Sequence, residues 1–143
     1  MSAYRQVLVA VDLTDGSRTI AARSVELAAP WHAQLHLLHV VEYLPVEPMS
    51  DALVPMAQVD DRLVGRALAQ VHALGEALAI EPACCHVATG NVKAEILRKA
   101  RELAVDLIVL GCRERHGLSI LVNLTEDTVL HGAPCDVLAM RVR

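Results

Sequence analysis

Aromatic residues are scarce in this chain of 143 residues, which has one Trp, two Tyr and no Phe. Modules that bind single-stranded nucleic acid stack bases on aromatic side chains, so this class of function is disfavoured. Basic residues are not in excess either, because 13 Lys and Arg stand against 17 Asp and Glu, for a formal net charge of −4. This balance argues against binding a phosphate backbone or an anionic membrane. We therefore expect no nucleic-acid partner and no membrane partner.

Long apolar runs are also missing. The solid apolar runs cover residues 7–11, 107–110 and 137–140, whereas a membrane-spanning helix needs about 18 residues or more. A signal peptide is not indicated, because Asp12 and Asp15 follow the first run directly and no longer apolar stretch with a small-residue cleavage site is present. We therefore expect a cytoplasmic protein.

Patterns that bind metals or supply nucleophiles are weak. None of the seven histidines forms a helical i, i+4 pair with a nearby carboxylate. His36 and His39 are three apart on a predicted strand, so we expect them on opposite faces. Ser119 lacks the G-x-S-x-G turn of hydrolases. The four cysteines contain no Cys-x-x-Cys pair and are expected to be reduced, mostly buried thiols: Cys84, Cys85, Cys112 and Cys135. We expect no metal, no catalytic residue and no enzyme activity.

The residues that are present predict one folded domain over 1–143. Apolar residues make up 54% and charged residues 21% of the chain, which excludes disorder. Short apolar runs predict strands at Arg5–Val11, Gln34–Val41, Ala83–Ala88, Leu107–Leu110 and Asp136–Val142. Helices are predicted from Thr14 or Ser17 to about Ala29, over 56–78, from Asn91 to Leu103, and over 124–131. In the second helix the apolar positions are Met56, Val59, Leu63, Ala67, Val71, Leu74 and Leu78.

This alternation of strands and helices predicts an α/β fold. Strands that are apolar on both faces belong to a parallel sheet covered by helices on both sides, that is, a doubly wound sheet. Ligands of such sheets bind at the carboxyl ends of the strands. Residues 111–123 are predicted to form a loop at this edge. Residues 42–55 contain three prolines and are predicted to be irregular, either a partner surface or a segment that packs in a dimer.

Four stretches together resemble the universal stress protein family. They are VLVAVDLTDGS at 7–17, LHLLHVVE at 35–42, ATGNVKAEIL at 88–97, and the long tail DLIVLGCRERHGLSILVNLTEDTVLHGAPCDVLAM at 106–140. The resemblance implies a five-stranded parallel sheet of the adenine-nucleotide alpha hydrolase-like type, with strand order 3-2-1-4-5. It also implies a homodimer that pairs through the C-terminal strand, and a role in the stress response.

The family has two branches, which differ in a glycine loop after the fourth strand. One branch binds ATP or AMP through a loop of the form G-x-x-G-x9-G-[ST], and the other branch lacks this loop. In this sequence Gly111 fills the first position and Thr125 the last, but Glu114 and Leu124 replace the second and third glycines. The inner residues Gly117 and Ser119 match both intact and degenerate loops.

These two replacements oppose phosphate binding. Glycines let backbone N–H groups turn toward an anion at close range. A carboxylate at Glu114, about 5 Å from a phosphate, would repel it by roughly 3 kcal/mol at an effective dielectric constant near 20. Asn123 and Glu126 resemble a capping box, and Asp127 adds further negative charge, so the next helix satisfies its own N-terminus. We therefore predict no cofactor, and a role in protein interaction or signalling with an unidentified protein partner.

The alternative is a member that binds ATP or AMP through a degenerate loop. Arg113 and Arg115 could hold a phosphate without glycines, although they could equally neutralise Glu114. Asp12 matches a family position that contacts the nucleotide, or it only caps the turn after the first strand. The resemblance then implies these cofactor-binding residues: Asp12, Val40, Gly111, Arg113, Arg115, Gly117, Ser119 and Thr125. A weak ATPase is the enzymatic form of this alternative.

Overall fold

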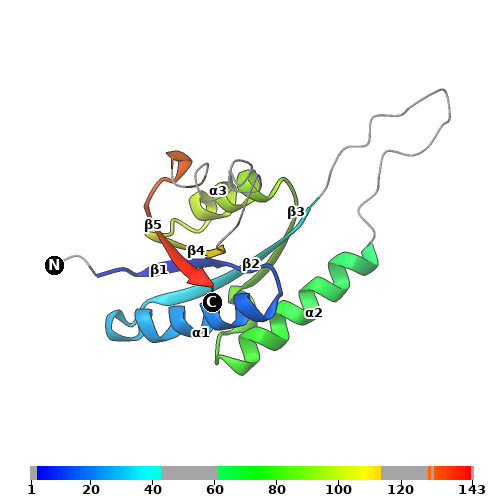
Figure 1. Ribbon diagram of the computed structural model, residues 1–143, viewed down its shortest axis with the longest axis horizontal. Helices are drawn as coiled ribbons and strands as arrows, with labels where there is room; N and C mark the ends of the chain where they lie inside the picture. Colours follow the sequence, from blue (N-terminus) through cyan, green and yellow to red (C-terminus); the bar gives the residue numbers. More distant parts are fainter. Residues whose placement is uncertain (1–2, 43–60, 114–128, 130, 143) are drawn as a thin grey trace.

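The computed structural model describes residues 3–42, 61–113, 129 and 131–142 (Figure 1). The elements, in chain order, are β1 (Gln6–Ala10), α1 (Asp15–Ala28), β2 (Gln34–Glu42), α2 (Asp61–Ala77), β3 (Cys85–Gly90), α3 (Val92–Glu102), β4 (Leu107–Arg113) and β5 (Asp136–Val142). Two short 3-10 helices cover Ala29–Trp31 and Pro82–Cys84. No helix of the described ranges is long and apolar enough to cross a membrane.

The five strands form one parallel sheet in the order β3-β2-β1-β4-β5. Helices α1 and α2 cover one face of the sheet, and α3 covers the other face (Figure 1). The predicted fold class and strand order are therefore confirmed. The two covered faces explain why the strands are continuous apolar runs in the sequence.

The core is split into two layers by the alternation of side chains along the strands. On the face covered by α1 and α2, Val7 and Val9 of β1 pack with Ile20 and Val71. On the opposite face, Leu8 packs with residues of β2, β4 and α3, namely Leu38, Ile108 and Ile96. Each of these side chains is almost fully buried. Consecutive residues of β1 therefore stabilise opposite layers.

Polar residues set the starts of two helices. Thr14 is the N-cap of α1, and its side chain accepts a hydrogen bond from the backbone N–H of Ser17, which decides between the two predicted caps. Asn91 caps α3 and accepts from the backbone N–H of Ala94 at 3.0 Å. Gly90 precedes this cap with a φ of +134°, a conformation that glycine adopts without strain. The predicted cap at Asn91 is confirmed, whereas Gly90, predicted as a turn, is the last residue of β3.

Some strand boundaries and the burial of one helix residue differ from the sequence prediction. Strand β3 begins at Cys85 because Pro82–Cys84 forms a 3-10 turn. Strand β4 continues to Arg113 because it pairs with β5 as far as Val142, so residues 111–113 are strand, where a loop was predicted. In α2, Leu63 is 53% exposed although its period placed it on the buried face.

The remaining predicted elements lie largely outside the described residues. These are the irregular segment 42–55 apart from Glu42, the first turns predicted for the second helix, and most of the last helix. Of that last helix, residues 129 and 131 are described and are helical, and residue 132, beyond its predicted end, is helical as well.

Candidate functional site

The candidate site lies at the carboxyl ends of β1, β2 and β4. The ladder between β1 and β2 ends at the pair Ala10–Leu38, and the ladder between β1 and β4 ends at Val9–Val109. Strands β2 and β4 both continue beyond the end of β1, so they flank the turn that begins at Asp12. Ligands of parallel sheets bind at this edge, next to the central strands.

Asp12 is held by the turn that follows β1. Its Oδ1 accepts hydrogen bonds from the backbone N–H of Thr14 at 3.0 Å, from the Thr14 hydroxyl at 2.6 Å and from the Ser17 hydroxyl at 2.5 Å. The backbone N–H of Asp12 donates to Ser17 Oγ at 2.7 Å. Leu13, between these partners, has a φ of +64°, which is uncommon for a residue with a side chain. These bonds orient the carboxylate and hold Leu13 in its unusual conformation.

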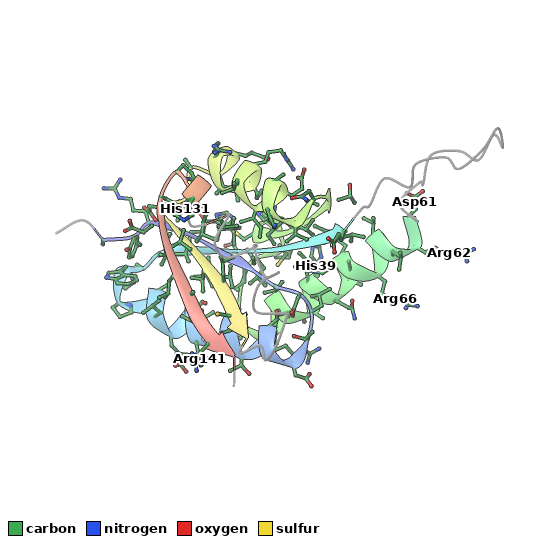
Figure 2. All side chains as sticks on the ribbon, turned by 45° about the horizontal axis from the view of Figure 1, so that its top comes forward. His39, Asp61, Arg62, Arg66, His131 and Arg141 are labelled. Atoms are coloured by element: carbon green, nitrogen blue, oxygen red, sulfur yellow. The ribbon has the colours of Figure 1, made fainter. Side chains whose placement is uncertain are left out.

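His39 of β2, labelled in Figure 2, contacts the backbone that follows β1. Its Nδ1 lies 2.8 Å from the carbonyl oxygen of Val11. Because a carbonyl oxygen can only accept, Nδ1 carries the proton, and in the neutral ring Nε2 keeps its lone pair. The adjacent Val40 is 8% exposed and belongs to the core on the α3 side. His39 and Val40 therefore face opposite sides of β2.

The structure brings only part of the predicted binding set together. Asp12, Val40 and Gly111 lie at the same edge of the sheet, with Gly111 in register with Met140 of β5. Arg113 is the last residue of β4. The remaining predicted positions, including both glycine replacements, lie outside the described residues: Glu114, Arg115, Gly117, Ser119, Leu124 and Thr125.

The four cysteines are free thiols. Cys84 and Cys85 are buried, whereas Cys112 and Cys135 are half-buried, so burial is less complete than predicted. Burial is the main cause that raises the pKa of the Cys85 and Cys135 thiols. A raised pKa keeps these two thiols protonated and weakly nucleophilic at neutral pH. Among the described residues, no three or more His, Cys, Asp and Glu are grouped so that they could hold a metal ion.

Sequence reasoning missed a pair of histidines on neighbouring strands. His36 Nδ1 of β2 lies 3.1 Å from His86 Nε2 of β3, and the two rings are stacked. The two residues are 50 positions apart, and only the strand register brings them together. The one signal in the sequence is that each histidine interrupts an apolar strand.

The fold is that of an α/β protein with a doubly wound parallel sheet, and the candidate site lies at the carboxyl ends of its strands. The chain belongs to the universal stress protein family, whose pattern it matches over residues 3–141. This family assignment rests on a sequence match that spans nearly the whole chain.

Relatives of known sequence agree with this assignment. The chain is 36% identical to Universal stress protein A homolog 2 of Coxiella burnetii (strain RSA 493 / Nine Mile phase I) over 144 residues, which covers 100% of this chain and 99% of the relative. It is 31% identical to Universal stress protein A homolog 1 of the same organism, with 96% of each chain covered.

Solved structures show the same fold. Universal stress protein UspA from Lactobacillus plantarum superposes with a TM-score of 0.76 at 26% identity, covering 99% of this chain and all of that one (100%). A universal stress protein solved in complex with cAMP superposes with a TM-score of 0.71 at 20% identity, covering 99% and 100% of the two chains. At 20% identity the second likeness concerns the fold alone.

Proposed function

We propose that this protein is a universal stress protein of the branch that does not bind ATP through the loop after β4. The observation that carries this proposal is the replacement of two loop glycines by Glu114 and Leu124. A phosphate loop needs backbone N–H groups that approach the anion closely, and glycine allows this approach. Glu114 adds a negative charge where a phosphate would lie, and Leu124 adds a branched side chain where the motif has none.

We further propose that the protein is a cytoplasmic homodimer without enzyme activity, acting in the stress response through contacts with another protein. Strand β5 supports the dimer, because it is the last strand of the described sheet and pairs with β4 on one side. Edge strands with apolar residues need to be covered or paired. A second β5, related by a two-fold axis, would cover this edge.

A second candidate function is nucleotide binding through a degenerate loop. It is favoured by the structural likeness to a universal stress protein solved in complex with cAMP. Asp12 and Val40 lie at the carboxyl edge of the sheet, as this function requires. ATP or AMP would then be held by these residues with Gly111, Arg113, Arg115, Gly117, Ser119 and Thr125, and a weak ATPase activity would be possible.

Titration calorimetry with ATP tests the first candidate. We expect the wild-type protein to bind ATP with a Kd weaker than roughly 1 mM. The double variant Glu114→Gly/Leu124→Gly should bind more tightly, by up to about a hundredfold if the repulsion from Glu114 dominates. Micromolar binding by the wild-type protein would favour the second candidate.

The matched control is Glu114→Gln, which removes the charge but does not restore the backbone freedom of glycine. A gain in affinity with Glu114→Gln alone would identify electrostatic repulsion as the cause. A gain that appears only in the double glycine variant would identify the backbone. If neither variant gains affinity, these two positions do not explain the loss of binding.

A further inference from the structure

A chain of polar side chains crosses the first residues of three neighbouring strands. Gln34 Nε2 donates to Cys84 Sγ at 3.1 Å, and Gln6 Nε2 donates to Gln34 Oε1 at 3.2 Å. Gln6 Oε1 then faces His36 Nε2 at 2.7 Å, and His36 Nδ1 faces His86 Nε2 at 3.1 Å. The chain lies at the amino ends of β1, β2 and β3, at the edge of the sheet opposite the candidate site.

The donors and acceptors in this row of hydrogen bonds decide which ring nitrogens of His36 and His86 carry protons. Gln6 Oε1 can only accept, so His36 Nε2 carries a proton and donates it. In the neutral His36 ring, Nδ1 is then an acceptor, so His86 Nε2 must carry the proton that lies between the two rings. One lone pair remains, on His86 Nδ1.

This arrangement accepts one added proton and resists a second. The first proton binds the lone pair of His86 Nδ1 and leaves every hydrogen bond of the chain in place. A second proton would have to bind His36 Nδ1, where it would meet the N–H of His86 Nε2 across 3.1 Å. Two N–H groups that point at each other at that distance repel, so both rings cannot be charged while the fold is intact.

The surroundings also favour the neutral pair. His36 is 6% exposed, and His86 is half-buried. Burial is the main cause that lowers the pKa of both histidines, and the Lys99 ammonium of α3 lowers it further. Glu102, also on α3, acts in the opposite direction on the pKa of His86, and its carboxylate is paired with Lys99 at 3.3 Å. The neighbours from β1 and the start of β2 are the neutral amides of Gln6 and Gln34.

We propose that His36 and His86 form a one-proton site through which mild acidification destabilises the fold. In the unfolded chain both histidines bind a proton near pH 6.5, and the folded pair binds at most one. Stability is therefore fully present above about pH 6.5 and falls as the pH drops below it, because the unfolded state takes up more protons.

Equilibrium denaturation of the full chain between about pH 7.5 and about pH 5 tests this proposal, using the wild-type protein and His86→Gln. The Gln amide can present either its N–H or its oxygen to His36 Nδ1, so His36 can bind its own proton in the variant. One excess proton corresponds to a tenfold change in the unfolding constant per pH unit. We expect the unfolding constant of the wild-type protein to rise about tenfold more per pH unit below about pH 6 than that of His86→Gln.

The matched control is His72→Gln, because His72 is an exposed histidine of α2. This variant should follow the wild-type protein across the whole pH range. If wild-type and His86→Gln curves run parallel, or if His72→Gln departs from the wild-type curve as His86→Gln does, the proposal is wrong.

A nuclear magnetic resonance titration of the histidine rings in the wild-type protein tests the same proposal without a variant. We expect one ring of the pair to stay neutral down to about pH 5. Independent protonation of both rings near pH 6.5 in the folded protein would overturn the proposal, even if His86→Gln does not fold.

Discussion

At the scale of single residues, Asp12 separates the two candidate functions. Its Oδ1 accepts three hydrogen bonds from Thr14 and Ser17, which hold the turn before α1. We expect Asp12→Ala to lower the free energy of unfolding by about 1 kcal/mol, because a cap-like acceptor is lost. This corresponds to a fall of about 2–4 °C in the melting temperature. Thermal denaturation measures the change, and Asp15→Ala, an exposed carboxylate three residues further on, is the control.

The same melting experiment with added ATP reports on ligand contact. If Asp12 only holds the turn, ATP should not shift the melting temperature of the wild-type protein or of Asp12→Ala. If Asp12 contacts bound ATP, ATP should raise the melting temperature of the wild-type protein and not that of Asp12→Ala. The second result would contradict the proposed branch.

Gly75 of α2 is required for the close approach of the helix to β3. A Cβ atom at this position would lie 2.5 Å from Cys85 Sγ. We expect Gly75→Ala to lower the free energy of unfolding by about 1–3 kcal/mol through overpacking. Gly65→Ala lies in the same helix, and beyond the adjacent backbone of that helix no described residue comes within 4 Å of the added Cβ. This variant should instead raise the free energy of unfolding by about 0.5–1 kcal/mol. Chemical denaturation measures both.

A double-mutant cycle assigns the cause at Gly75. In a Cys85→Ala background the sulfur is gone, so Gly75→Ala should lose most of its cost. If the cost is unchanged in this background, the contact with Cys85 is not its source.

At the scale of elements, the proposed homodimer depends on strand β5. Consecutive N–H groups of a strand point to opposite sides, so of Leu138→Pro and Ala139→Pro one removes a donor that faces β4 and the other a donor that faces the open edge. Light scattering should show a dimer of twice the chain mass for the wild-type protein. The variant at the open edge should weaken this dimer with little change in melting temperature. A wild-type monomer at micromolar concentration would refute pairing through β5.

Strands and caps were predictable because their signals are local. A buried strand of a parallel sheet is a solid apolar run, and β5 has the predicted bounds of Asp136–Val142. The caps at Thr14 and Asn91 follow from short polar side chains directly before helical periods. The extension of β4 through residues 111–113 was missed because it depends on pairing with β5, a contact between distant segments.

Functional features were harder to predict for the same reason. The Asp12 turn was foreseen, because its partners Thr14 and Ser17 are close in the chain. The pairing of His36 with His86 was not, because it needs the register of β2 against β3. In the sequence these are two isolated histidines, and a buried histidine is most simply interpreted as part of the core.

At the scale of the whole molecule, we expect a family member that keeps the fold and has lost the bound nucleotide. The family is established by a match over residues 3–141, and the fold is established for the described residues. The loss of the nucleotide is a proposal that rests on the sequence of the loop after β4. The low aromatic content of 2% is useful here. Because the chain itself absorbs weakly in the near ultraviolet, a bound adenine would dominate the spectrum of the purified protein.

The measurement that tests the central claim most directly is therefore the adenine nucleotide content of the protein as purified. The ultraviolet spectrum is recorded first, and the supernatant of a heat-denatured sample is then analysed by chromatography against ATP, AMP and cAMP standards. We expect the spectrum of a nucleotide-free protein and no adenine nucleotide above the buffer blank. Release of stoichiometric ATP, AMP or cAMP would contradict the account and assign the protein to the nucleotide-binding branch.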